Sequence, residues 1–140
     1  MTKSSEYALR ALIYLTQHKD QWPIPGREIA QRAGIPARYL QKVLGDLTRT
    51  RVLESTPGRV GGFRLCRPGN RIPLIDVLTP FERFQAGRCP FGNAVCSDRN
   101  PCRAHHEWKK VVEAEQRFLS KMTIDDVAEP IEIKRRGRAR

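Results

Sequence analysis

The sequence comprises 140 residues with a formal net charge of +11 and four cysteines. This length suits one domain, or a small head with an assembly element, around a modest core. No apolar run approaches the ~18 residues of a membrane span, and charges interrupt the N-terminal apolar stretch, which argues against a signal peptide. We therefore expect a cytoplasmic protein with no membrane partner, whose cysteines bind metal or do redox work rather than form disulfides.

The positive charge is concentrated in two segments. Residues 27–71 contain ten lysines and arginines against three acidic residues, and residues 134–140 add five more basic side chains. The rest of the chain is close to neutral. Such clustering is typical of a surface that binds nucleic acid. An ordinary solvated basic surface is the alternative.

A first helix is predicted from Ser4 or Ser5, either of which can cap it, to about Lys19. Its apolar residues recur at the spacing of a half-buried helix. The prolines of residues 21–25 then break the helical pattern.

Residues 27–48 have the pattern of a helix-turn-helix. A short helix over 27–32 ends at Gly34, where glycine permits a left-handed turn, and Pro36 suits the start of a second helix that runs to about Thr48. The second helix has a buried stripe formed by Leu40, Val43, Leu44 and Leu47. Its outer face carries residue types that can reach base edges and phosphates from the major groove, namely Arg38, Tyr39, Gln41 and Lys42.

Two short extended runs follow, residues 51–55 and 62–65. The glycines between them permit a β-hairpin with Arg59 at its tip. A helix-turn-helix followed by a basic hairpin indicates a winged helix, in which the hairpin contacts a neighbouring groove or the DNA backbone. We interpret Cys66, in the second strand, as a small apolar packing residue. The candidate DNA-binding residues are Arg27, Arg38, Tyr39, Gln41, Lys42, Arg49 and Arg59.

Three of the four cysteines lie in one irregular stretch, residues 89–106. Cys89, Cys96 and Cys102 are separated by six and five residues, and His105 and His106 follow. Prolines and a glycine disfavour a helix there, and thiolates are good ligands for iron–sulfur clusters and zinc. We therefore predict a metal centre in this loop.

The cysteines allow two other interpretations. A structural Cys3His zinc site is the alternative, although zinc sites usually contain a shorter Cys-x2-4-Cys spacing. An electron carrier is less favoured, because carriers usually hold their clusters with four cysteines. The sequence contains no nucleophile–base set, phosphate loop or dinucleotide fingerprint, so we do not expect an enzyme. The sequence also lacks the aromatic stacking motif that an RNA-binding module would need.

The C-terminal part predicts assembly. A helix over residues 73–84 precedes the cysteine loop, and a long helix runs from about Ala104 to Met122, followed by a capped turn over 123–127. The long helix carries a stripe of apolar side chains that is too extensive for a small head to cover, so we expect a homodimer. The alternative is that the long helix folds back onto its own head. This stripe comprises Trp108, Val111, Val112, Phe118, Leu119 and Met122.

The predicted fold is mainly α. A winged helix-turn-helix head spans residues 1–84, and a cysteine-rich cluster-binding loop spans 85–106. A dimerisation helix follows over 107–128. A basic tail over 129–140 is expected to be disordered without nucleic acid.

Over nearly its whole length the chain resembles the bacterial Rrf-type winged-helix regulators, which include the iron–sulfur cluster assembly regulator IscR, the nitric-oxide-sensitive repressor NsrR and the rhizobial iron regulator RirA. Four motifs carry the resemblance: EYALRALIYL, IAQRAGIPARYLQKVLGDL, RVGGFRL, and the three-cysteine loop before a long helix that ends MTIDDV. The resemblance implies a dimer formed by crossing long helices. It also implies DNA contacts from the recognition helix and the wing, matched here by Arg38, Tyr39, Gln41 and Arg59.

The resemblance further implies a cluster held by Cys89, Cys96, Cys102 and one non-cysteine ligand. The cluster-assembly branch uses a histidine shortly after the third cysteine, which His105 matches. The nitric-oxide branch uses a carboxylate in the first helix of the other subunit, which Glu6 matches. We slightly prefer Glu6 and keep His105 open. The first cysteine gap is one residue longer than is usual in both branches.

The implied function is that of a transcriptional regulator, expected to act as a repressor, which binds a palindromic promoter site on double-stranded DNA as a homodimer. Its affinity is expected to change with the state of a [2Fe–2S] or [4Fe–4S] cluster, in response to nitric oxide, redox state or iron supply. A mixed set of sulfur and weaker ligands suits a sensor, because it shifts the cluster potential and leaves one iron more open to attack.

Overall fold

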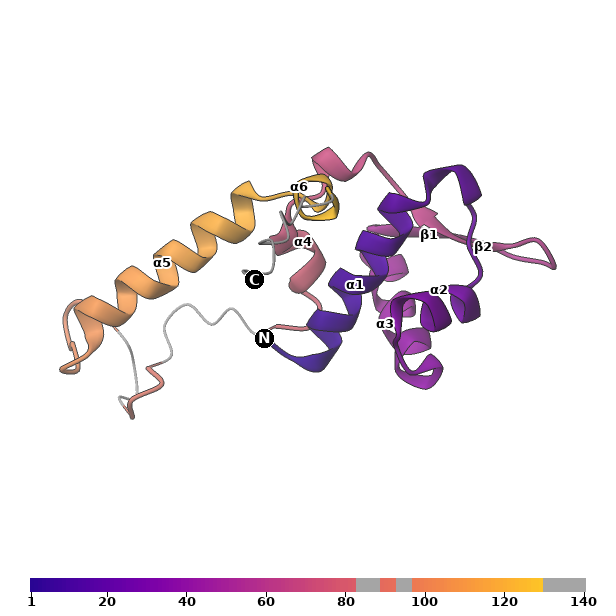
Figure 1. The fold of residues 1–140 in the computed structure, drawn as a ribbon. Helices are drawn as coiled ribbons and strands as arrows, with labels where there is room; N and C mark the ends of the chain where they lie inside the picture. The colour runs from indigo at the N-terminus through magenta and orange to yellow at the C-terminus, as the bar shows by residue number, and fades with distance from the viewer. Residues whose placement is uncertain (83–88, 93–96, 130–140) are drawn as a thin grey trace, which may run out of the picture.

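The computed structural model describes residues 1–82, 89–92 and 97–129 (Figure 1). Cys96 and the basic tail from residue 130 onward therefore lie outside the described residues. In chain order the elements are α1 (Lys3–Gln17), η1 (Lys19–Gln21), α2 (Gly26–Ala33), α3 (Ala37–Arg49), β1 (Leu53–Thr56), β2 (Gly62–Leu65), η2 (Gly69–Arg71), α4 (Leu74–Leu78), α5 (His105–Lys121) and α6 (Ile124–Ala128).

Helix α1 forms the centre of the head. Its buried face includes Ala8, Ala11, Leu12 and Leu15, which expose no surface. The helix contacts α2, α3, α4 and α6, so its apolar face contributes to one continuous core. Removal of this apolar surface from water is the main force that holds these helices together.

The cap of α1 differs from the prediction. The side chain of Thr2 accepts a hydrogen bond from the N–H of Ser5. An N-cap side chain bonds the second or third residue of its helix. Because the helix begins at Lys3, Ser5 is the bonded residue and not the cap.

Helices α2 and α3 form the predicted helix-turn-helix. Gly34 adopts φ 65° and ψ 43°, the left-handed conformation that glycine takes at low cost. The buried residues of α3 are the four that the sequence pattern identified: Leu40, Val43, Leu44 and Leu47. The periodicity therefore predicted this face correctly.

The wing is a two-stranded antiparallel hairpin in which Leu53 lies opposite Leu65. Its second strand is also fixed to the segment before α2, because the backbones of Phe63 and Ile24 exchange hydrogen bonds of 2.8 and 3.0 Å. Leu65 is buried, whereas Cys66, the residue after the strand, is exposed. Successive residues of an extended chain point in opposite directions, so the interpretation of Cys66 as a packing residue is wrong.

Helix α4 is shorter than predicted and ends at Leu78. Pro80 has no N–H with which to continue the helical ladder. Helix α6, in contrast, is capped as expected: Thr123 and Asp126 form a reciprocal capping box. Ile124 is fully buried and α6 packs against α1, so residues 124–128 belong to the head.

Helix α5 extends away from the head (Figure 1). Only its C-terminal end joins the core, through buried Leu119. Val111 and Phe118 remain 53% and 54% exposed. The chain entering α4 is paired with the chain leaving α5, because Leu74 N–H bonds to Met122 O at 2.8 Å and Ile124 N–H bonds to Ile72 O at 3.0 Å.

Gly62 provides a test of how the wing is attached. A Cβ at this position would lie 2.3 Å from the carbonyl carbon of Ile24. We expect Gly62→Ala to lower the free energy of unfolding by more than about 1 kcal/mol, because the backbone pairing with Ile24 must shift.

The matched control is Gly45→Ala. A Cβ at Gly45, within α3, meets no atom within 4 Å, so we expect it to stabilise the chain by about 0.5–1 kcal/mol. Urea denaturation measures both. Equal stability of the two variants would contradict the attachment.

Candidate DNA-binding surface and cysteine-loop metal centre

The outer face of α3 is basic and exposed. Arg38, Gln41 and Lys42 are exposed there, and Tyr39 is 61% exposed. The first turn of α3 carries no acidic residue. The structure therefore brings these four predicted residues onto one helix whose opposite side is buried.

The other three predicted DNA-binding residues flank α3. Arg27 is exposed in the first turn of α2, and Arg59 is exposed in the hairpin between β1 and β2. Arg49 ends α3, where its guanidinium pairs with Asp46. That pairing reduces the charge that Arg49 presents to a phosphate.

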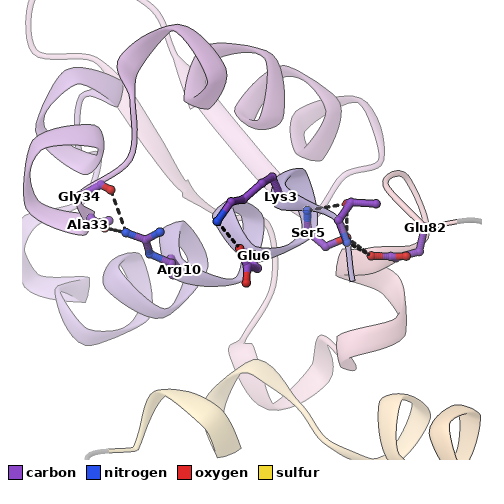
Figure 2. Close-up of polar contacts among 8 residues, drawn as sticks. Lys3, Ser5, Glu6, Arg10, Ala33, Gly34 and Glu82 are labelled. Atoms are coloured by element: carbon purple, nitrogen blue, oxygen red, sulfur yellow. Dashed lines mark hydrogen bonds and ion pairs between the residues drawn. The ribbon is translucent and has the colours of Figure 1, made fainter.

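Arg10, which the sequence analysis missed, fixes the turn between α2 and α3. Its Nη2 donates to the carbonyl oxygens of Ala33 and Gly34 at 2.7 and 2.8 Å (Figure 2). The same guanidinium lies 5.7 Å from the ring centre of Tyr7, and that ring lies 6.3 Å from the ring of Tyr39. Helix α1 therefore contacts both the turn and the recognition helix.

The cysteine loop brings two sulfurs together. Cys89 is 6% exposed, and its Sγ lies 3.6 Å from the Sγ of Cys102. A disulfide would need about 2.05 Å. Two sulfurs bound to one tetrahedral metal at about 2.3 Å are separated by roughly 3.8 Å. The observed separation is therefore close to that of two thiolates on one metal.

The loop packs against the start of α5. The ring of Phe91 meets the ring of Trp108 edge to face, with ring centres 5.6 Å apart. Part of the apolar stripe assigned to a dimer partner is therefore covered by the loop. The N–H of His105 bonds to Cys102 O at 3.1 Å, so α5 begins directly after the third cysteine.

The two candidate fourth ligands have different surroundings. Glu6 is exposed in the first turn of α1, and its Oε2 accepts a hydrogen bond from Lys3 at 3.2 Å (Figure 2). His105 is 4% exposed, and its Nε2 lies 2.8 Å from Oδ1 of Asp98. Among the described residues, Asp98, His105 and His106 form a group whose possible ligand atoms lie within 4.8 Å of one another.

Asp98 was not identified from the sequence. It also accepts hydrogen bonds from Lys109 Nζ, at 3.1 and 3.4 Å. The hydrogen bond with His105, followed by that from Lys109, lowers the pKa of Asp98. A carboxylate between two cysteines of a predicted metal-binding loop is the sequence signal that could have found it.

Glu82 is the last described residue before the cysteine loop, and its side chain binds the start of α1. Its Oε1 accepts hydrogen bonds from the N–H of Thr2 at 2.6 Å and from the hydroxyl of fully buried Ser5 at 2.7 Å (Figure 2). Burial raises the pKa of Glu82, but the hydrogen bonds from Ser5 and Thr2 together lower it by more than burial raises it. The pKa of Glu82 therefore lies below its ordinary value. A carboxylate is also favoured at a helix N-terminus.

In the part of the chain that the structure describes, no helix is both long and apolar enough to cross a membrane.

A buried helix-turn-helix with an exposed basic face, beside a fixed β-hairpin, defines a winged-helix DNA-binding protein. Comparison with known structures supports the winged-helix fold. CymR of B. subtilis, described as its global cysteine regulator, has a TM-score of 0.75 at 20% identity, covering 91% of this chain and 95% of that one. IscR of T. potens has a TM-score of 0.71 at 22% identity, covering 91% and 84%.

The family model "Rrf2: Iron-dependent Transcriptional regulator" matches residues 1–130, and the chain belongs to this family of helix-turn-helix transcriptional regulators. Protein rrf2 of Nitratidesulfovibrio vulgaris is 30% identical over 128 residues, which is 91% of this chain and 85% of that protein. The regulator IscR of Xenorhabdus nematophila is 27% identical over 134 residues, covering 95% and 81%. The predicted family and winged-helix fold are thus confirmed.

Arg59 tests the wing. We expect Arg59→Ala to weaken binding to a duplex that the wild-type protein has selected from a random library, by ~1–3 kcal/mol if the contact is bidentate to a base. Arg64→Ala is the control, because Arg64 is on the same hairpin but pairs with Glu54 at 3.1 Å. Fluorescence anisotropy measures both affinities. A loss for Arg59→Ala no larger than that for Arg64→Ala would place the hairpin tip away from DNA.

Glu82 predicts a pH dependence of stability. Because its pKa is lowered in the folded state, the carboxylate stabilises the fold above its ordinary value of 4.5, and this contribution disappears as the pH falls through the lowered value. Glu82→Gln should therefore be less stable than wild type at neutral pH, and the difference should shrink in acid. Urea denaturation across pH measures it.

Glu107→Gln is the control for this pH series, since Glu107 forms only an exposed ion pair with Lys110. A stability difference for Glu82→Gln that stays constant from neutral to acidic pH would show that the charge of Glu82 is not what binds the start of α1.

Proposed function

We propose that this chain is an iron–sulfur-cluster-sensing transcriptional regulator, acting as a repressor, which binds a palindromic site on double-stranded DNA as a homodimer. The observation that carries the metal centre of this proposal is the separation of 3.6 Å between the sulfurs of Cys89 and Cys102, beside a winged-helix head. In a reducing compartment, paired cysteines of this kind bind metal more often than they form disulfides.

The donor set fits a cluster. Cys89 and Cys102, together with Cys96, would supply three thiolates, and His105 or Glu6 would supply one nitrogen or oxygen donor. The cysteine gaps of six and five residues lack the short spacing usual in zinc sites. When bound, a cluster with such mixed ligands supplies a group that reacts with oxidants and nitric oxide and that depends on iron supply.

The chain's own residues link this loop to the DNA-binding surface through α1. Glu82 binds the first turn of α1 at the edge of the loop. One to two turns further along α1, Tyr7 contacts Tyr39 of the recognition helix and Arg10 binds the turn before it. A change in the loop that displaces the start of α1 therefore also displaces residues that hold α3.

Homodimerisation is supported by α5. Val111 and Phe118 leave large apolar side chains on an arm that extends beyond the head. Two recognition helices must lie about 34 Å apart to enter successive major grooves on one side of DNA. The binding of a dimer is therefore sensitive to small rotations of its heads.

A zinc-stabilised regulator without redox sensing is the second candidate. The separation of the Cys89 and Cys102 sulfurs fits two thiolates on one zinc ion as well as on one iron. Metal analysis separates the two candidates.

The proposal is tested by anaerobic purification followed by analysis of iron, sulfide and zinc. Wild-type protein should be brown and contain iron with sulfide. Cys89→Ser and Cys102→Ser should each lose the colour, whereas Cys66→Ser should keep it, because Cys66 lies outside the loop and is exposed.

DNA binding is then compared for the protein with and without its cluster on the selected duplex. The affinity should change on cluster removal for wild type and for Cys66→Ser, and should not respond in the two loop variants. A colourless protein with stoichiometric zinc, or an affinity that is the same in both states, would refute the proposed sensor.

A further inference from the structure

The hairpin between β1 and β2 ends in a closed tip that projects beyond the head (Figure 1). The strand ladder stops at the pair Thr56 and Gly62, so residues 57–61 form the tip. Within the tip, Gly61 N–H donates to Gly58 O at 3.1 Å, which closes a β-turn with Arg59 and Val60 at its two corners. The structure therefore presents these two side chains together on a hydrogen-bonded turn.

Val60 is 89% exposed, more than any other large apolar side chain in the part of the chain that the structure describes. The corners of β-turns are occupied mainly by Gly, Pro, Asn, Asp and Ser, whose chemistry favours the turn. A β-branched valine gives the turn no such advantage and here buries almost nothing, so it contributes little to the stability of the fold. Its isopropyl group is instead exposed to a binding partner.

The chemistry of the tip indicates which surface it would bind. Residues 57–61 carry one cation and no acidic side chain. A phosphate backbone would attract Arg59 but would gain nothing specific from an isopropyl group. The floor of a DNA minor groove suits both side chains, because A·T pairs present only acceptors there, whereas G·C adds the N2 amino group of guanine. Arginine is favoured in narrow A·T-rich minor grooves, and apolar side chains act there as wedges.

The position of the hairpin fits this groove. The exposed face of α3 is the surface predicted to enter the major groove, and the backbone of Phe63 holds β2 beside the segment before α2. Because the two grooves alternate along a duplex, a projection beside a helix in the major groove meets the DNA backbone and then the minor groove. The minor groove is about 6 Å wide, so it admits the tip of the hairpin more readily than its two-stranded body.

We propose that Val60 is a specificity-determining residue: it enters the minor groove beside Arg59 and selects A·T base pairs by excluding the N2 amino group of guanine. An isopropyl group cannot accept a hydrogen bond, so the amino group would lose its water without gaining a partner. This inference rests on the DNA-binding part of the proposed function and is independent of the metal centre.

A protein partner is the competing occupant of the tip. Stable protein–protein interfaces bury about 800 Å² on each side, far more surface than one slender hairpin tip supplies. The two occupants are also separable by experiment, since only a contact with DNA makes Val60 affect the choice between base pairs.

The test uses the duplex that the wild-type protein has selected from a random library. Each A·T pair is replaced in turn by G·C, by inosine·C and by 2,6-diaminopurine·T. Inosine·C keeps the major-groove pattern of G·C without the amino group, and diaminopurine·T keeps that of A·T with it. Where the tip contacts DNA, wild type should bind inosine·C as tightly as A·T, and G·C and diaminopurine·T roughly 5–100-fold more weakly. Affinities that follow the major-groove pattern at every position would overturn the inference.

Val60→Ala is the decisive variant. It should bind all four duplexes about equally at that position, because the smaller side chain leaves room for the amino group, and its stability to urea should match wild type. Arg59→Ala should bind every duplex more weakly and still reject the amino group. Ser55→Ala, an exposed change on β1 away from the tip, should behave as wild type.

Wild-type discrimination in Val60→Ala, or its loss in Arg59→Ala alone, would overturn this inference and leave the cluster-sensing proposal intact. A protein that binds no cluster but shows the expected discrimination would overturn the sensor and support the role of Val60. A protein that selects no duplex from the library would overturn both.

Discussion

The burial of α1 is the constraint on which the rest of the structure depends. One helix supplies the apolar surface against which the helix-turn-helix, α4 and α6 all pack. Burial of a Val, Leu or Ile side chain contributes about 1.5–3 kcal/mol, and Leu12 and Leu15 of α1 expose no surface at all. A displacement of α1 therefore cannot be confined to one part of the head.

Polar contacts at the two ends of this buried face give α1 a second role. At its start, Glu82 accepts hydrogen bonds from Thr2 and Ser5. Two turns later, Arg10 satisfies carbonyl oxygens at the end of α2, groups that a helix terminus leaves without partners. The same short helix segment thus contacts Glu82, which precedes the cysteine loop in the sequence, and the turn before the recognition helix.

The sequence predicted the features that depend on local pattern. The helical period identified the four buried residues of α3, and glycine chemistry identified the turn at Gly34, because both are decided within a few residues. The cysteine spacing also predicts a metal centre from thiolate chemistry alone, and that centre stays a prediction. Cys66 was misjudged because its direction depends on where β2 ends.

Contacts between distant parts of the chain could not be found in this way. Glu82 and Ser5 are 77 residues apart, and Arg10 and Gly34 are 24 apart. Asp98 is seven residues from His105, but an irregular loop has no period from which that contact follows. The packing of α6 against α1 could not be predicted either, because the sequence of a short amphipathic segment does not show which surface it covers.

The paired backbone at residues 72–74 and 122–124 has a consequence for how this chain tolerates change. Two hydrogen bonds, at 2.8 and 3.0 Å, bring together the points where the chain departs into α4 and where it comes back from α5. The stretch between α4 and the C-terminal end of α5 is therefore closed at its base, whereas α4 itself packs against α1. The cysteine loop within this stretch can therefore gain a residue, as in the six-residue gap after Cys89, while the winged-helix head keeps its structure. Lengthening such a loop adds little closure entropy.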